Sequence, residues 1–288
     1  MEKKHDVFLI SPSGKVNLEK LNIAKNRLEV LGFNVHCLDS VIDSDFYFAG
    51  STDRRIKEFR IAMNSSSEII YAIRGGYGSL ELLSQELLDE FLNYNKTIVG
   101  CSDITSLLIG LYFNGYDAPL IHGPMPGTKN WPKNDLEIKL LEKCLSNQYY
   151  SVQLDNYNLL YRNIKSFEGS IIGGNLRILC HHIGTEFDFL TDEYILFLED
   201  VNERAPAIYQ MLLHLEKANK LKKIKALLLS EFVNCGENIQ FIEKFIERLK
   251  IPVIANLPLG HTPSMIPIIL GSNIRYDNRN NILEFNTT

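Results

Sequence analysis

The chain has 288 residues, of which 45% are hydrophobic and 23% are charged, and its formal net charge is -5. This length is sufficient for two domains with cores of their own, and an acidic chain without a basic patch is unlike a general nucleic-acid-binding protein. The five cysteines are scattered and include no C-x-x-C pair, which is typical of free thiols in a reducing compartment. These totals exclude a disulfide framework and a cysteine-based zinc site.

The apolar stretches are all short. The one near the N-terminus, about five residues long, is too short for a signal peptide, and none approaches the ~18 residues of a membrane span. We therefore expect a cytoplasmic protein with no membrane partner. The sequence also lacks a G-x-G-x-x-G fingerprint and histidines at metal-ligand spacing, so we expect neither a cofactor nor a metal.

The first hundred residues alternate between apolar β-branched runs and segments with helical spacing. The expected strands are 6–10, 33–38 and 68–73, and the expected helices are 18–31, 54–63 and 80–92. This order predicts an α/β fold whose parallel strands are joined by right-handed crossovers.

A glycine-rich loop, Arg74-Gly75-Gly76-Tyr77-Gly78, follows the third expected strand. Glycines at such a place allow a close backbone approach or a positive φ angle. The loop is suited to hold an anion or to supply an N–H group to an oxyanion, and the alternative is a plain flexible connection. Ligands of α/β proteins bind at the carboxyl ends of the strands, which favours the functional interpretation.

The segment 97–113, TIVGCSDITSLLIGLYF, joins a buried strand to an apolar helix through a sharp turn. A turn of this kind would expose the hydroxyl of Ser102 and direct the N–H of Asp103 at a carbonyl oxygen, as in a nucleophile elbow. The usual pattern is G-x-S-x-G, and Thr105 replaces the second glycine here. The alternative is an ordinary strand and helix with a capping serine or aspartate.

His122 lies near the end of an expected strand and is a candidate base or ligand, although a histidine there more often forms a hydrogen bond with a loop. We predict an N-terminal domain at 1–130, an interdomain connection at 131–165 and a C-terminal domain at 166–288.

The second half again alternates strands and helices. The expected strands are 194–198, 224–229, 251–254, 267–276 and 282–285, and the expected helices are 207–218 and 239–249. Gly173 and Gly174 precede another helix, which Asn175 could cap unless it contacts a ligand. Glu199 and Asp200 directly follow a buried strand, where two acids are costly unless they are paired or belong to a site.

Three residues that each follow an expected strand together provide the groups for acyl transfer, namely Ser102, Glu199 and His261. A serine hydroxyl needs a histidine to take its proton, and the histidine needs an acid that fixes its tautomer. The N–H of Asp103, with that of Gly75 or Gly76, would stabilise the oxyanion.

The same residues lie in motifs that resemble LD-carboxypeptidases of the muramoyltetrapeptide type, a family that includes the microcin C immunity peptidases. The matching motifs occur in the family's order along nearly the whole chain: RGGYG at 74–78, SDIT at 102–105, HGPM at 122–125, GGNL at 173–176, LED at 198–200 and LPLGH at 257–261. The resemblance implies that Ser102 is the nucleophile, Glu199 the acid and His261 the base. One departure is Cys101, where the family often has a bulky residue.

The resemblance further implies an N-terminal Rossmann-like parallel-sheet domain with the elbow, a second α/β domain, an active site at their interface, and a homodimer. The implied reaction releases D-alanine from cytoplasmic murein tetrapeptides during peptidoglycan recycling. Arg74, Asn175 and Glu203 are the residues that we expect to bind this peptide substrate.

Two other functions stay open. The first is a microcin-type peptidase that cleaves a peptidyl-nucleotide and stacks the base on an aromatic loop, for which Trp131 is the candidate. The second is a peptide-binding α/β protein without activity, against which the presence of Ser102, Glu199 and His261 argues.

Overall fold

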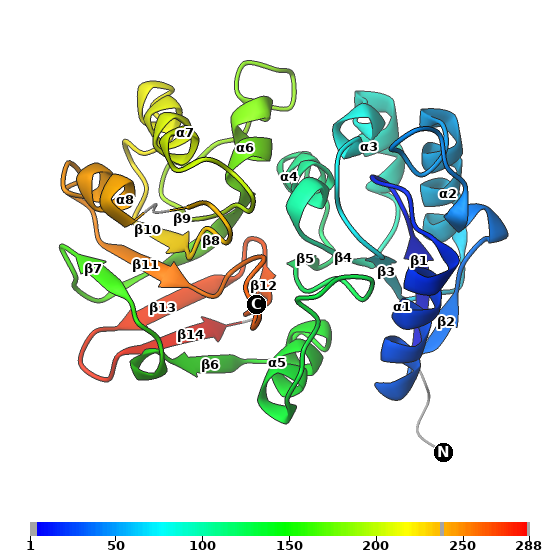
Figure 1. The fold of residues 1–288 in the computed structure, drawn as a ribbon, viewed down its shortest axis with the longest axis horizontal. Coiled ribbons are helices and arrows are strands. Elements are labelled where there is room, and N and C mark those ends of the chain that lie inside the picture. Colours follow the sequence, from blue (N-terminus) through cyan, green and yellow to red (C-terminus); the bar gives the residue numbers. More distant parts are fainter. Residues whose placement is uncertain (1–4, 237–238, 287–288) are drawn as a thin grey trace. The chain divides into compact units, whose positions relative to one another are not determined.

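A computed structural model describes residues 5–236 and 239–286, and the chain divides into two compact units, residues 1–131 and 132–288. Both units combine helices with a β-sheet (Figure 1). Within the described ranges, no helix is both long enough and apolar enough to span a bilayer.

The first unit is built on parallel strands in the spatial order β5-β4-β3-β1-β2. The strands are β1 (Asp6–Ile10), β2 (Asn34–His36), β3 (Ile69–Ala72), β4 (Thr97–Gly100) and β5 (Leu120–His122), and the helices are α1 (Leu18–Val30), α2 (Thr52–Asn64), α3 (Gln85–Phe91) and α4 (Thr105–Phe113). The predicted alternation of strands and helices and the parallel sheet are confirmed. Parallel strands have their carboxyl ends at one edge, so the loops after β1, β3 and β4 start from the same edge.

The predicted helix 80–92 is wrong in detail. The chain forms a 3₁₀ turn at Ser79–Leu82 and then starts α3 separately. Ser84 is extended, and its hydroxyl accepts a hydrogen bond from the backbone N–H of Leu87. A serine that caps a helix start ends the preceding turn, which the apolar spacing alone does not reveal.

The second unit has one sheet with the strand order β6-β14-β13-β8-β9-β10-β11-β7. The strands are β6 (Tyr150–Gln153), β7 (Leu160–Arg162), β8 (Phe167–Asn175), β9 (Ile195–Glu199), β10 (Ala226–Ser230), β11 (Val253–Leu257), β13 (Asn273–Asp277) and β14 (Ile282–Asn286), with the short β12 (Ile268–Ile269) before β13. Strands β8 to β11 are parallel, and the outer strands are antiparallel. The helices are α5 (Asp135–Leu145), α6 (Leu176–His182), α7 (Ala205–Lys217) and α8 (Ile239–Ile246), of which α6, α7 and α8 lie on one side of the sheet (Figure 1).

The segment 131–165, which the sequence predicts to be a connection, contains regular structure. It holds α5, β6 and β7, and both strands pair within the second sheet, with β14 and β11 respectively. Tyr150 is buried in β6, and its ring stacks on Phe285 of β14 at 4.5 Å between centroids. The short β6 is therefore stabilised by pairing with a distant strand, and its own sequence does not predict a strand.

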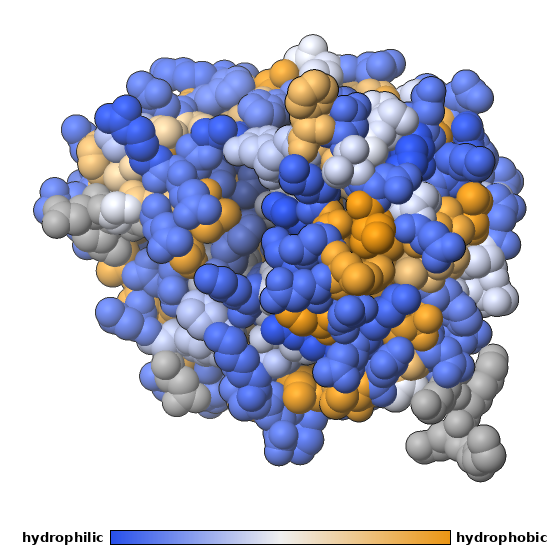
Figure 2. Space-filling model, turned by 45° about the vertical axis from the view of Figure 1, so that its right-hand side comes forward, coloured by the Kyte–Doolittle hydropathy of each residue, from blue (hydrophilic) through white to orange (hydrophobic). Residues whose placement is uncertain are grey.

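The face drawn in Figure 2 is mostly hydrophilic, with hydrophobic side chains gathered in separate patches. Large apolar side chains that are more than half exposed include Leu18, Val30, Phe46, Leu136 and Leu190. Most other apolar side chains are buried, and those of β1, β3, β9 and β10 have nearly no exposed surface. The hydrophobic residues thus mainly form the cores that hold the strand ends in place.

Candidate active site

A strained turn places Ser102 directly after β4. Ser102 has a φ of +62°, a left-handed conformation that non-glycine residues adopt rarely and that often marks functional turns. A 3₁₀ turn at Ser102–Ile104 leads into α4. A Cβ on Gly100 would lie 2.7 Å from Ile104, so this glycine allows the helix to approach the strand closely. Thr105 is an ordinary helical residue with a φ of -47° and needs no glycine.

The cysteine beside the serine is enclosed in the protein. Cys101 is 0% exposed, whereas Ser102 is only partly buried. The turn therefore presents the hydroxyl rather than the thiol. The aspartate on the other side, Asp103, is 3% exposed and points inward.

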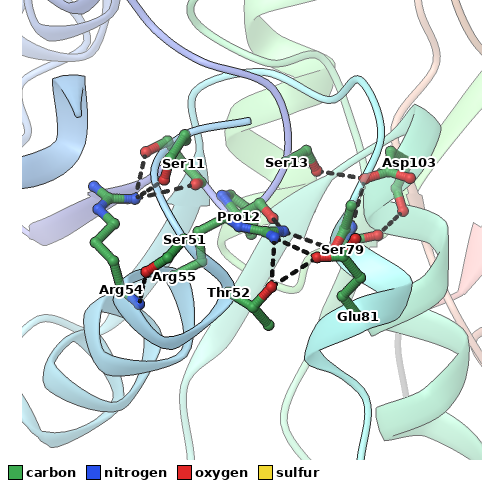
Figure 3. Close-up of polar contacts among 12 residues, drawn as sticks. Ser11, Pro12, Ser13, Ser51, Thr52, Arg54, Arg55, Ser79, Glu81 and Asp103 are labelled. Atoms are coloured by element: carbon green, nitrogen blue, oxygen red, sulfur yellow. Dashed lines mark hydrogen bonds and ion pairs between the residues drawn. The ribbon is translucent and has the colours of Figure 1, made fainter. Parts of the chain in front are cut away.

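Two serines from other loops hold the Asp103 side chain (Figure 3). The hydroxyl of Ser13, after β1, donates to Asp103 Oδ2 at 2.6 Å, and the backbone N–H of Ser79 donates to the same oxygen at 2.9 Å. The Ser79 hydroxyl donates to the Asp103 carbonyl oxygen. These contacts fix the peptide that follows Ser102. Sequence analysis missed both serines, and their only local signal is that each lies after a strand of the parallel sheet.

The glycine loop lies against the serine. A Cβ added to Gly75 would lie 2.9 Å from Ser102 Cβ, 3.2 Å from Ser102 Oγ and 3.3 Å from the Asp103 nitrogen. Gly76 has a φ of +135°, and a Cβ there would lie 3.1 Å from the nitrogen of Gly14. Only glycines allow this backbone to lie so close to the hydroxyl and to the N–H that follows it.

We expect Gly75→Ala to lower kcat/KM by at least about 100-fold, because the added methyl group displaces Ser102 or the loop by a sizeable fraction of an ångström. Steady-state kinetics and a thermal melt of the same preparation measure the effect. Gly115→Ala is the control, since Gly115 also has a positive φ, +89°, but open space around its Cα. A Gly75→Ala protein as active as the control would contradict the close approach.

In the second unit a carboxylate and an imidazole form a pair. Glu199 ends β9 with 0% exposed surface, and its Oε2 lies 2.8 Å from His261 Nδ1. Since an ionised carboxylate only accepts hydrogen bonds, Nδ1 carries the proton and Nε2 is left as the acceptor. A Cβ on Gly260 would lie 2.7 Å from Glu199 Cβ, so the glycine before the histidine allows the loop to approach the acid.

The charges around the imidazole favour its protonated form. Burial lowers the pKa of His261, but the nearby Glu199 and Asp200 carboxylates raise it by more, so the pKa lies above the ordinary value of 6.5. Burial, followed by the charge of Glu199, raises the pKa of Asp200 to about 7. The two carboxylates therefore stabilise an imidazolium at His261.

Asn175 connects the two acids. Its Nδ2 donates to Glu199 at 3.3 Å and to Asp200 at 3.1 Å, while its Oδ1 accepts from the N–H of Ile178 and caps α6. Asp200 also accepts from the N–H of Arg177 at 3.0 Å. The Arg177 guanidinium forms an ion pair with Glu203 at 2.5 Å. The structure thus brings Asn175, Glu199 and His261 together, and connects Glu203 to them through Arg177.

The remaining predicted residues lie as follows. The guanidinium of Arg74 donates to the carbonyl oxygens of Gly75 and Lys15, and among the described residues no carboxylate forms an ion pair with it. His122 is fully buried at the end of β5. Trp131 is 6% exposed and packs near Tyr71, with 6.2 Å between ring centroids.

In the ranges that the structure covers, no group of three or more His, Cys, Asp or Glu side chains could hold a metal ion.

Comparison with known proteins identifies the family. The LD-carboxypeptidase N-terminal domain matches residues 7–123, and the LD-carboxypeptidase C-terminal domain matches residues 168–275. A Rickettsia conorii protein named as a carboxypeptidase is 31% identical over 233 residues, which cover 79% of this chain and 74% of that protein. The chain belongs to the LD-carboxypeptidase family. Its elbow lies in the region matched by the first domain, and the Glu199–His261 pair lies in the region matched by the second.

Two further proteins are similar to this chain along most of its length. The crystal structure of a muramoyltetrapeptide carboxypeptidase from Oxalobacter formigenes superposes with a TM-score of 0.83 at 26% identity and covers 98% of both chains. The microcin C7 self-immunity protein MccF of Escherichia coli is 28% identical over 278 residues, which cover 82% of this chain and 80% of that protein. The two-domain α/β fold implied by the sequence motifs is confirmed.

Proposed function

We propose that this protein is a serine LD-carboxypeptidase that removes the terminal D-alanine from murein tetrapeptides. The observation that carries the proposal is the hydrogen bond from His261 Nδ1 to the fully buried Glu199, because it leaves Nε2 as a base. We propose that this base activates the hydroxyl of Ser102, which lies at a strained turn. The likeness to a muramoyltetrapeptide carboxypeptidase along nearly the whole chain supports the choice of substrate.

In the proposed reaction the Ser102 hydroxyl attacks the carbonyl carbon of the last peptide bond while His261 Nε2 takes its proton. Glu199 stabilises the imidazolium, and the N–H of Asp103, with that of Gly75 or Gly76, binds the oxyanion. The C–N bond then breaks, and His261 gives the proton to the leaving D-alanine. Water, activated by the same histidine, hydrolyses the acyl-enzyme and restores Ser102.

We propose Arg74 as the group that binds the free carboxylate of the substrate. Its guanidinium lies next to Gly75 with only carbonyl partners among the contacts described above. We expect Arg74→Gln to raise KM for the tetrapeptide by roughly tenfold with a smaller change in kcat, since a hydrogen bond to a charged group contributes about 1.5 kcal/mol. Substrate saturation curves measure this split.

The matched test of that role uses a tetrapeptide whose C-terminus is an amide. Wild type should lose affinity for the amide, whereas Arg74→Gln should distinguish little between amide and acid. If wild type and Arg74→Gln distinguish the acid from the amide equally well, a group other than Arg74 binds the substrate carboxylate. Asn175 and Glu203 remain predicted substrate contacts, and a substrate there would share them with Asp200 and Arg177.

The MccF relative, of which one solved structure is in complex with aspartyl sulfamoyl adenosine, supports a second candidate, cleavage of a peptidyl-nucleotide. The site chemistry would be the same, and the difference lies in what binds beyond the scissile bond. Trp131, the candidate for stacking a base, is almost fully buried, which favours the murein substrate. We further propose that the protein is a cytoplasmic homodimer that acts in peptidoglycan recycling, and light scattering of the purified protein tests the dimer.

The deciding experiment offers both substrates to the same preparation. Purified protein is incubated with a meso-diaminopimelyl-D-Ala or L-Lys-D-Ala tetrapeptide and, separately, with an aminoacyl sulfamoyl adenosine, and products are identified by mass spectrometry. We expect tripeptide and D-alanine from the first and little product from the second. Preferential cleavage of the nucleotide would favour the immunity function, and binding of the peptide without cleavage would favour a non-catalytic protein.

A further inference from the structure

Arg55, on α2, is a buried arginine whose side chain has several polar partners. Its side chain is 1% exposed, and its Cζ lies 5.2 Å from the centroid of the Phe48 ring. The guanidinium donates to the hydroxyl of Thr52 at 3.1 Å and to the carboxylate of Glu81 at 2.6 Å. Since Glu81 is about half exposed, the pair reaches from the interior to the surface.

The other terminal nitrogen of Arg55 connects two loops (Figure 3). It donates to the carbonyl oxygen of Pro12 at 3.0 Å and to that of Gly78 at 2.7 Å. Each of these residues directly precedes a serine that holds Asp103. One guanidinium therefore holds both loops from which Asp103 receives its hydrogen bonds.

The fit around this group is close. Gly78 has a φ of +115°, and a Cβ there would lie 2.7 Å from the Arg55 terminal nitrogen and 2.9 Å from the Phe48 ring. A guanidinium has a planar fork of fixed donors, whereas the lysine ammonium is a single point on a flexible stem. Lysine at position 55 would keep the charge but could not hold the two carbonyls and Glu81 with the same geometry.

We propose that Arg55 is a positioning residue that fixes the oxyanion-binding peptide of the elbow through the Pro12–Ser13 and Gly78–Ser79 loops. The proposal rests on the proposed function, in which the N–H of Asp103 stabilises the oxyanion. Because its side chain is only 1% exposed, Arg55 is assigned an indirect role rather than a contact with substrate. Its effect is to keep the peptide after Ser102 in place, which affects the acylation step rather than substrate binding.

The test compares Arg55→Lys with wild type in two assays. The first is the rate at which a fluorophosphonate probe, whose fluoride is displaced by a serine oxygen, labels Ser102. The second is the tetrapeptide reaction, with kcat and KM separated. We expect labelling and kcat to be roughly 10- to 100-fold lower in Arg55→Lys, with KM changed little.

Arg27→Lys is the matched control. Arg27 also donates to two backbone carbonyls, those of Pro126 and Thr128, both at 2.7 Å, in a loop with no bond to Asp103 among those described. Arg27→Lys should also lose thermal stability, while its labelling rate stays near that of wild type. A similar loss of labelling in both variants would show a general effect of destabilisation and overturn the proposal.

A double-mutant cycle with Ser13→Ala tests whether Arg55 acts on Asp103 through the loop that contains Ser13. If Arg55 acts through the loop of Ser13, Arg55→Lys should slow labelling by a smaller factor in Ser13→Ala than in wild type. Equal factors, or labelling of Arg55→Lys at the wild-type rate, would overturn the proposal while the proposed function stands. Wild type that is not labelled at Ser102 would overturn the proposed function and this proposal with it.

If Arg55→Lys does not fold, Glu81→Gln replaces it, because Glu81 lies at the surface end of the same network. Weakening this partner should slow labelling several-fold. Unchanged labelling of a folded Glu81→Gln protein would then count against the proposal.

Discussion

Ser102→Ala is expected to abolish turnover of the tetrapeptide, with a loss of kcat on the order of 10⁶-fold, as for nucleophiles of other serine hydrolases. The serine oxygen is the only atom of this turn that is proposed to form the acyl-enzyme. The alanine protein should fold normally and still bind substrate, because the turn is held by Asp103 rather than by the hydroxyl. Release of D-alanine and binding by calorimetry measure the two effects separately.

Cys101→Ala is the matched control for this loss. The thiol is fully buried beside the serine, so its removal should cost some stability and leave most of the activity. Turnover that survives in Ser102→Ala and disappears in Cys101→Ala would transfer the nucleophile to the cysteine. Activity retained in both variants would remove the elbow from the mechanism.

Glu199→Gln is expected to lower kcat by roughly 10⁴-fold, the effect seen when an amide replaces the acid of a serine triad. The carboxylate holds the proton on His261 Nδ1 at 2.8 Å. An amide can instead donate to Nδ1, which places the proton on Nε2, where it blocks the base. Steady-state kinetics of the two proteins measure the loss.

Glu199→Gln should also change the pH dependence of kcat/KM, because it removes the negative charge beside His261. The base works only when neutral, and the pKa of His261 lies above 6.5, so the activity of wild type should fall as the pH drops through that higher value. Removal of the Glu199 charge lowers this pKa, so the acid limb of kcat/KM should move to lower pH. A limb that stays in place, or moves upward, would contradict the assignment of His261 as the base.

Glu168→Gln is the control for replacing a glutamate by glutamine, since Glu168 lies on β8 with an exposed side chain. Both its kcat and its pH profile should match wild type. Asp200→Asn should move the acid limb downward by less than Glu199→Gln, because Asp200 raises the pKa of His261 only through its charge, whereas Glu199 also accepts its hydrogen bond. An equal shift in both variants would indicate that the hydrogen bond adds nothing.

Many elements of both units follow from local sequence patterns, although the predicted strand 267–276 is divided into β12 and β13. Fully apolar runs such as 194–198 predict buried parallel strands, and the turn at Ser102 is recognisable because a glycine, a polar tip and an apolar helix succeed one another within a few residues. The split of the predicted helix 80–92 and the strands β6 and β7 were not predictable in this way. The helix is divided because Ser84 caps the start of α3. Strands β6 and β7 form because they pair with the distant strands β14 and β11.

The sequence by itself thus determined the α/β class, the position of the elbow and the residue types of the proposed triad, because each depends on neighbours within one strand, turn or helix. Only the tertiary structure decided how these residues are held. Ser13 and Ser79 reach Asp103 across 90 and 24 residues of chain, and Arg55 connects their loops from a helix. In the same way, Asn175 contacts Glu199 and Asp200 only because β8 and β9 are neighbours in the sheet. Hydrogen bonds between distant segments leave no periodic signal in sequence, since they depend on which strand ends share one edge of a sheet.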